Sequence, residues 1–113
     1  MKRHLQRELE NLKRRILSLG AMVEERVRMA IQALETRDAK AAEEIMGADN
    51  EIDAMEVEIE EECLKILALH QPVAVDLRFI AAVIKINNDL ERIGDEAVNI
   101  AKRVVYISKR PPI

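Results

Sequence analysis

Apolar residues recur at alternating spacings of three and four along the first third of the chain. This spacing places them on one side of an α-helix. The set is Leu5, Leu9, Leu12, Ile16, Leu19, Val23, Val27, Ala30 and Leu34. It predicts one long helix over residues 3–35, which Gly20 interrupts without ending the pattern.

A second helix is predicted over residues 38–70, where the sequence is rich in Ala and Glu. Thr36 and Asp38 stand before it, and either side chain can cap a helix. Gly47 is a candidate kink. The apolar stripe after it is Ile52, Met55, Ile59, Cys63 and Ile66.

A third helix is predicted over residues 73–106, because Pro72 disfavours helical geometry at Gln71 and suits a helix start. Its main apolar stripe is Phe79, Val83, Ile86, Leu90, Ile93, Ala97, Ile100 and Val104. A second apolar group, Leu77, Ile80 and Ile84, lies on the other side. We therefore expect this helix to pack between neighbours. Residues 108–113 contain Pro111 and Pro112 and read as a linker-like tail.

Three helices of similar length predict an all-α fold, an antiparallel three-helix bundle about 45 Å long. The 113 residues suffice for one domain, residues 1–113, but not for two independent cores. A β-domain is excluded because the chain has too few turn and strand residues. It contains three Gly, three Pro, one Tyr and one Phe.

Charge and cysteine content narrow the class of protein. The formal net charge of −3 argues against a nucleic-acid partner, because a domain that binds nucleic acid usually has an excess of basic residues. The single Cys63 excludes an intrachain disulfide and a CxxC motif, and its place in the apolar stripe predicts an inert buried thiol. No apolar run approaches the roughly 20 residues of a membrane span, and the polar start lacks a signal-peptide core. We expect a cytoplasmic protein.

Acidic residues form two matched pairs four residues apart, Asp49 with Asp53 and Glu91 with Asp95. Glu56 and Glu60 continue the first line, so four acids stand beside the apolar stripe of the second helix. If the second and third helices are antiparallel neighbours, Asp53 and Glu91 lie at similar heights. Carboxylate oxygens suit hard cations such as Mg²⁺, Mn²⁺, Ca²⁺ or ferric iron. The alternative is an ordinary solvated helix face.

Catalytic chemistry finds no support among the remaining residues. His4 and His70 lie at a terminus and at a helix end, where capping or solvent exposure is the ordinary role. A di-iron oxidase bundle would need Glu-x-x-His pairs, which the sequence lacks. The glycines are isolated, so no phosphate-binding loop is present. We predict that the protein is not an enzyme.

The segment from Gln71 to Lys102, with QPVAVDLR and NNDLERIGDEAVNIAK, closely resembles the PhoU family of bacterial phosphate-uptake regulators. The resemblance implies a non-enzymatic regulator that represses phosphate-starvation signalling through a sensor histidine kinase and the phosphate ABC transporter ATPase. It also implies metal binding at DNEID and ERIGD, through Asp49, Asp53, Glu91 and Asp95. The expected cofactor is iron, or Mg, Mn or Zn. Contact with the membrane would be peripheral, through these partners.

Family members typically contain two tandem three-helix bundles, whereas this sequence matches one. We therefore expect either a fragment or a half-length protein that forms a homodimer or higher oligomer, with the second apolar group of the third helix as the contact surface. Two alternative functions stay open: a metal storage or oxidoreductase bundle, and a plain oligomerisation module.

Overall fold

The chain folds into four α-helices, shown in a computed structural model that describes residues 2–110, without the side chains of Lys2 and Asp49. They are α1 (Lys2–Thr36), α2 (Ala39–Gly47), α3 (Asp49–His70) and α4 (Ala74–Ser108). The all-α prediction is confirmed, and the predicted helix boundaries agree to within two residues. Of the predicted tail, Pro111 and Pro112 lie outside the described residues.

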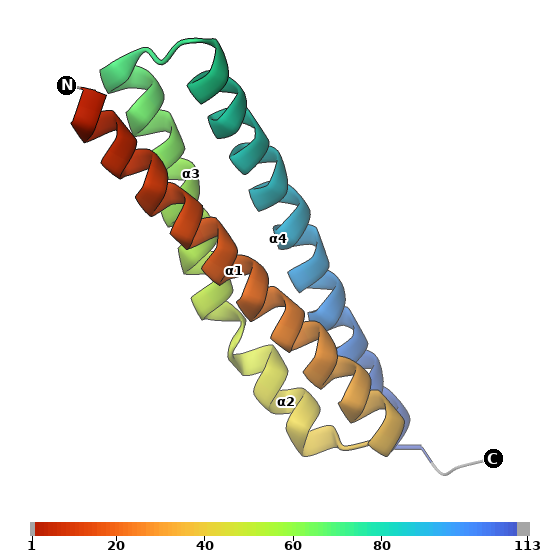
Figure 1. Cartoon of the computed structure of the whole chain (residues 1–113). Helices are drawn as coiled ribbons and strands as arrows, with labels where there is room; N and C mark the ends of the chain where they lie inside the picture. The colour runs from red at the N-terminus through yellow and green to blue at the C-terminus, as the bar shows by residue number, and fades with distance from the viewer. Residues whose placement is uncertain (1, 111–113) are drawn as a thin grey trace.

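The helices form a rod-shaped three-helix bundle, in which α2 and α3 follow one another in the position of a single helix (Figure 1). They run antiparallel to α1 and α4, which lie side by side and point the same way. The rod measures 63 × 18 × 17 Å. It is longer than the predicted 45 Å, and the 35 residues of α1 or of α4 account for about 52 Å of this length at 1.5 Å per residue.

The second helix is broken at Gly47 and Ala48, where the sequence predicted only a kink. Ala48 leaves helical geometry with φ −94° and ψ 3°. Its carbonyl accepts a hydrogen bond of 3.3 Å from the Arg26 guanidinium of α1, which also lies 3.9 Å from the Glu51 carboxylate. A side chain from a neighbouring helix thus satisfies a backbone carbonyl that the break releases.

Two short connections fix the helix order. Arg37 adopts a left-handed conformation with φ 55°, and Asp38 then caps α2 by accepting a 3.1 Å hydrogen bond from the Ala41 amide. Gln71 closes α3 with φ 44°. Val73 is the extended N-cap of α4, so Pro72 lies just before the helix rather than in its first turn.

The core has a large-residue half and a small-residue half. Leu, Ile and Val side chains of α1, α3 and α4 fill the half near the α3–α4 connection. At the other end, α1, α2 and α4 meet mainly through alanines: Ala30, Ala33, Ala42, Ala97 and Ala101. Small side chains allow the backbones of α1, α2 and α4 to approach closely in this half.

The inward face of α4 differs from the predicted stripe. Its buried residues are Ile80, Val83, Asn87, Gly94, Ala97, Ala101 and Val104. Ile86 and Ile93, predicted to be core residues, are 46% and 45% exposed. Relative to the prediction the helix is rotated, so that Asn87 and Gly94 face inward toward α3, where Asn87 bonds to the Glu56 carbonyl and Gly94 lies beside Ile52.

The predicted self-association group is therefore also wrong. Ile80 is fully buried in the bundle core, and Ile84 is half-buried against it. Only Leu77 is exposed. These three residues do not form one surface, so an oligomer contact has to lie elsewhere on the molecule.

Candidate metal site and related proteins

The two acidic motifs lie at the same level of the α3–α4 interface. The Asn87 amide donates a 3.0 Å hydrogen bond to the Glu56 carbonyl, which fixes the register of the two helices. Two turns along α4 from Asn87 and one turn along α3 from Glu56, a Cβ built on Gly94 would be 3.7 Å from the Ile52 side chain. Asp53 lies between Ile52 and Glu56, and Glu91 lies between Asn87 and Gly94, so the predicted similarity in height of Asp53 and Glu91 is present.

Asp53, Glu91 and Asp95 are all solvent-exposed. Asp49 begins α3, and its side chain lies outside the description. Among the described side chains, no group of three or more His, Cys, Asp and Glu residues has the geometry to hold a metal ion. The structure thus brings the motifs to one level without assembling three described carboxylates into a complete site.

The donor chemistry nevertheless suits a hard cation. Carboxylate oxygens are the ligands of Mg²⁺, Ca²⁺ and Mn²⁺, and exposed ions of this kind keep several waters in their coordination shell. The exposed carboxylates can move, because no packing against the core holds them. A metal here would be bound at the surface, where a partner could share it.

Glu56 behaves differently from the other acids on its line. It is 7% exposed, within the α3–α4 interface, whereas Asp53 and Glu60 face solvent. The spacing predicted one continuous acidic line beside the stripe. The line is interrupted because Glu56 lies one turn from both Ile52 and Ile59, on the inward side of α3.

Asn87 is the residue that the sequence reasoning missed. It is 4% exposed, and its Oδ1 has no hydrogen-bond partner among the described residues. Asn is unusual at a core position, and such residues can specify helix register at a cost in stability. Asn87 lies seven residues from both Ile80 and Gly94, so the three residues share one face of α4. This spacing indicates burial only once the structure shows that this face points inward.

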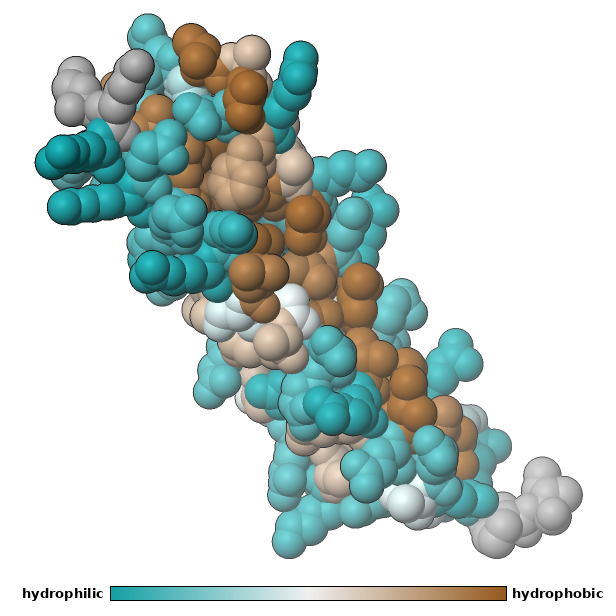
Figure 2. All heavy atoms as spheres, viewed as in Figure 1, coloured by the Kyte–Doolittle hydropathy of each residue, from teal (hydrophilic) through white to brown (hydrophobic). Residues whose placement is uncertain are grey.

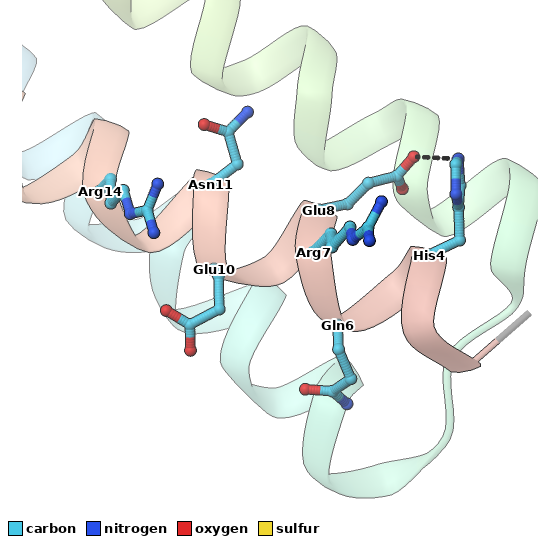
Figure 3. Close-up of a pocket in the computed structure, with 7 residues that line it drawn as sticks. All are labelled: His4, Gln6, Arg7, Glu8, Glu10, Asn11 and Arg14. Carbon is cyan, nitrogen blue, oxygen red and sulfur yellow. Dashed lines mark ion pairs between the residues drawn. The ribbon is translucent and has the colours of Figure 1, made fainter.

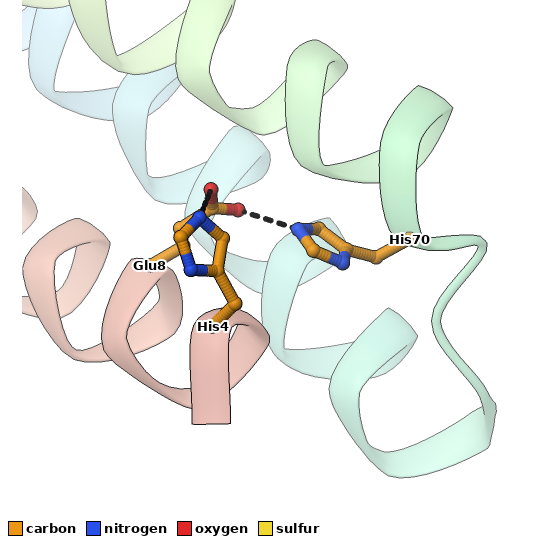
Figure 4. A network of polar contacts seen from close by, with 3 residues as sticks. All are labelled: His4, Glu8 and His70. Carbon is orange, nitrogen blue, oxygen red and sulfur yellow. Dashed lines mark hydrogen bonds and ion pairs between the residues drawn. The ribbon is translucent and has the colours of Figure 1, made fainter. Parts of the chain in front are cut away.

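A polar cluster joins the first turns of α1 to the end of α3 (Figure 4). His70 Nε2 lies 2.9 Å from Glu8 Oε2, and His4 Nε2 lies 3.9 Å from Glu8 Oε1. The His70 side chain is only 12% exposed, so the predicted capping or solvent role is wrong for His70, whereas His4 is 72% exposed. Beside the cluster, α1 residues from His4 to Arg14 line a shallow cavity of about 570 Å³ (Figure 3).

The thiol of Cys63 is fully buried in the core, as predicted. Burial raises the pKa of Cys63 to about 11, and the neighbouring Glu62 and Glu60 carboxylates add to the effect. A thiol with so high a pKa is a poor nucleophile at neutral pH. Cys63 therefore serves packing.

None of the helices in the described region combines the length and the apolar character that a membrane span requires.

Known proteins similar to this chain come from several bacteria. The phosphate-specific transport system accessory protein PhoU homolog of Aquifex aeolicus is 42% identical over 107 residues, which cover 95% of this chain and 48% of that protein. The accessory protein PhoU of Serratia marcescens is 42% identical over 95 residues, or 84% of this chain and 39% of that protein.

The crystal structure of PhoU from Pseudomonas aeruginosa superimposes with a TM-score of 0.89 at 41% sequence identity. It covers 92% of this chain and 50% of the Pseudomonas chain, so the present chain spans about half the length of these relatives. A family model described as the PhoU domain matches residues 16–104. The chain belongs to the PhoU domain family.

Proposed function

We propose that this protein is a non-enzymatic accessory protein of phosphate-specific transport. The observation that carries the proposal is the match, over nearly the whole chain, to proteins named as accessory proteins of that system. The structural likeness to PhoU from Pseudomonas aeruginosa, at 41% identity, supports it, because the two chains share both fold and sequence over the matched region.

The proposed mechanism is binding without catalysis. The bundle contacts the ATPase of the phosphate ABC transporter and a sensor histidine kinase, and couples them so that phosphate-starvation signalling is repressed when phosphate is plentiful. The exposed carboxylates of Asp53, Glu91 and Asp95 provide the docking patch. They act either through a shared metal ion or through their negative charge alone.

The regulatory part is tested in the source organism. Deleting the gene is expected to raise expression of a phosphate-starvation reporter in high-phosphate medium, and a plasmid copy is expected to restore repression. A copy with Asp53→Asn, Glu91→Gln and Asp95→Asn is expected to restore it poorly, whereas Glu58→Gln with Glu61→Gln, on exposed α3 positions, serves as the control. An unchanged reporter in the deletion strain would contradict the proposal.

The metal-binding part is tested on purified protein. We propose that Asp49, Asp53, Glu91 and Asp95 bind a hard cation such as Mn²⁺ or ferric iron, with Mg²⁺ and Zn²⁺ as further candidates. Metal analysis after dialysis against each ion is expected to show retention that the triple variant lacks and the control variant keeps. Redox-active iron with turnover would instead support the metal storage or oxidoreductase alternative.

A further inference from the structure

The end of the rod that holds the α3–α4 connection exposes aliphatic side chains. The three most exposed large apolar side chains of the described chain all lie here: Val73 at 77%, Val75 at 75% and Leu69 at 65%. Leu77, at 46%, lies beside them. We call these four residues the apolar tip, and Figure 2 shows brown atoms at this upper end of the rod.

The apolar tip lies on the end of the rod rather than along its flank. Leu69 is one residue from the end of α3, and Leu77 is three residues after the start of α4. At 1.5 Å per residue, both backbone positions are within about 5 Å of the helix ends. Helical side chains lean toward the N-terminus of their helix, so Val75 and Leu77 lean toward this end of the rod.

The connection at the opposite end of the rod has a different character. It consists of Thr36, Arg37 and Asp38, which are polar and exposed, as is usual for a turn in water. Val73 occupies the corresponding place in the α3–α4 connection and is 77% exposed, so packing against the bundle does not explain its side chain. The apolar tip is therefore available to a partner outside the bundle.

Arginine side chains stand around the apolar tip. Arg3 and Arg7 of α1 and Arg78 of α4 are all exposed. Both helices begin at this end of the rod (Figure 1), so their side chains also lean toward it. The 2.9 Å contact between His70 and Glu8 brings the first turns of α1 beside the end of α3. We call the three arginines the basic rim.

The charge at this end is opposite in sign to that of the whole chain. Residues 2–8 and 69–78 contain four Lys and Arg and two acids, whereas the net charge of the chain is −3. Neither acid extends freely from the end, because Glu8 contacts His70 and Asp76 is half-buried in the first turn of α4. Aliphatic side chains bordered by cations complement the boundary of a bilayer that contains anionic lipids.

From these observations we infer that the apolar tip inserts into the headgroup region of a membrane containing anionic phospholipids, while the basic rim binds the lipid phosphates. The size of the end favours a lipid surface over a protein. Its cross-section of 18 × 17 Å is on the order of 300 Å², well below the roughly 800 Å² per partner of a standard protein interface. A few inserted side chains and nearby cations suffice for reversible membrane binding. This contact needs no partner protein and is independent of the proposed function.

Binding by the end makes the rod stand on the membrane and keeps the acidic motifs away from it. Asp53 lies 17 residues before the end of α3, and Glu91 lies 17 residues after the start of α4. Both are therefore about 25 Å from the inserted end. This exceeds the Debye length of about 8–10 Å, so anionic lipids do not repel these carboxylates. The motifs stay accessible to a protein beside the membrane.

Flotation of the purified chain with lipid vesicles tests the contact. The wild type is expected to bind vesicles of phosphatidylcholine with 30% phosphatidylglycerol at 1 mM lipid. Val73→Ser with Val75→Ser is expected to lower the partition coefficient at least tenfold with unchanged helical circular dichroism, because both side chains are on the surface. Leu17→Ser with Val57→Ser, at exposed aliphatic positions on α1 and α3, is the matched control and is expected to bind like the wild type. A wild type that does not bind, or equal binding by the tip variant, would overturn the inference.

A second pair of variants tests the basic rim. Arg3→Gln with Arg7→Gln is expected to weaken binding to the anionic vesicles at least fivefold. Lys102→Gln with Arg103→Gln removes the same charge from exposed positions near the other end of α4 and is expected to have little effect. Equal losses in the two variants would show attraction by net charge alone and would contradict binding by this end. Equal binding of the wild type to vesicles of pure phosphatidylcholine would contradict recognition of lipid charge.

A dye attached to an added cysteine reports insertion directly. Cys63 is buried and its pKa is raised to about 11, so the added cysteine is the thiol that reacts in the folded chain. Val75→Cys carrying an environment-sensitive dye is expected to show blue-shifted emission with the anionic vesicles and quenching by spin-labelled lipid. Val57→Cys is expected to show neither. Unchanged emission from the dye at position 75 would show that the tip does not insert.

Discussion

The side-chain amide of Asn87 donates a hydrogen bond of 3.0 Å to the backbone carbonyl of Glu56 inside the α3–α4 interface. Replacing Asn87 with Ala removes this bond and leaves a small void, so we expect a loss of about 1–3 kcal/mol in the free energy of unfolding. Urea denaturation measures the change. Asn88→Ala, one residue along on the exposed side of α4, is expected to change stability by less than about 0.5 kcal/mol. Equal losses in the two variants would contradict a register-setting role.

Sequence reasoning could predict the helices but not the rotation of α4. Two lines with spacings of three and four run along this helix and share Val83, Leu90, Ala97 and Val104. Both lines have the same spacing, and the line with Ile86 and Ile93 is the more apolar, so hydrophobicity favours it as the predicted core face. In the structure the line containing Asn87 and Gly94 faces inward, where Asn87 donates a hydrogen bond to α3.

At the candidate metal site, too, the sequence could predict positions along the helices but not how the helices are rotated. Spacing and helix length correctly placed Asp53 and Glu91 at similar heights, because both depend only on chain geometry. The burial of Glu56 could not be predicted, because it depends on how far α3 is rotated toward α4. The break at Ala48 likewise depends on Arg26, a residue on another helix.

The contact between His70 and Glu8 is expected to stabilise the end of the bundle where α1 begins. Because both side chains are mostly buried, His70→Ala is expected to lower the free energy of unfolding by about 1 kcal/mol. His4→Ala is the control, since His4 is exposed and lies farther from Glu8. Thermal denaturation of both variants checks this, and a larger loss in His4→Ala would contradict the account.

Cys63 is expected to resist alkylation in the folded protein. Iodoacetamide at pH 8 should modify it only after addition of urea, because burial both shields the thiol and raises its pKa to about 11. Mass spectrometry counts the modified fraction. Ser18→Cys, on the exposed side of α1, is expected to react without urea.

The raised pKa of Cys63 also predicts how stability changes with pH. The folded chain keeps the thiol proton up to about pH 11, whereas the unfolded chain releases it near the ordinary value of 9.0. The unfolded state therefore binds fewer protons in this window, and stability falls as pH rises from 9 to 11. Urea midpoints should decline more steeply for the wild type than for Cys63→Ala. Parallel declines would contradict this assignment.

Asp38 is expected to be the residue that starts α2. Asp38→Ala removes the hydrogen bond to the Ala41 amide and should lower the free energy of unfolding by about 0.5–2 kcal/mol. Asp38→Asn keeps an acceptor oxygen and should restore most of it. Urea denaturation of the pair separates capping from charge, since a loss of equal size in both variants would indicate charge.

We propose that this bundle works by binding the phosphate transport machinery. The most direct measurement is biolayer interferometry between the purified chain and the ATPase subunit of the phosphate ABC transporter from the same organism. We expect saturable binding that weakens at least tenfold in the Asp53→Asn, Glu91→Gln, Asp95→Asn variant and is unchanged in Glu58→Gln, Glu61→Gln. Absence of binding at 100 µM wild-type chain would contradict it.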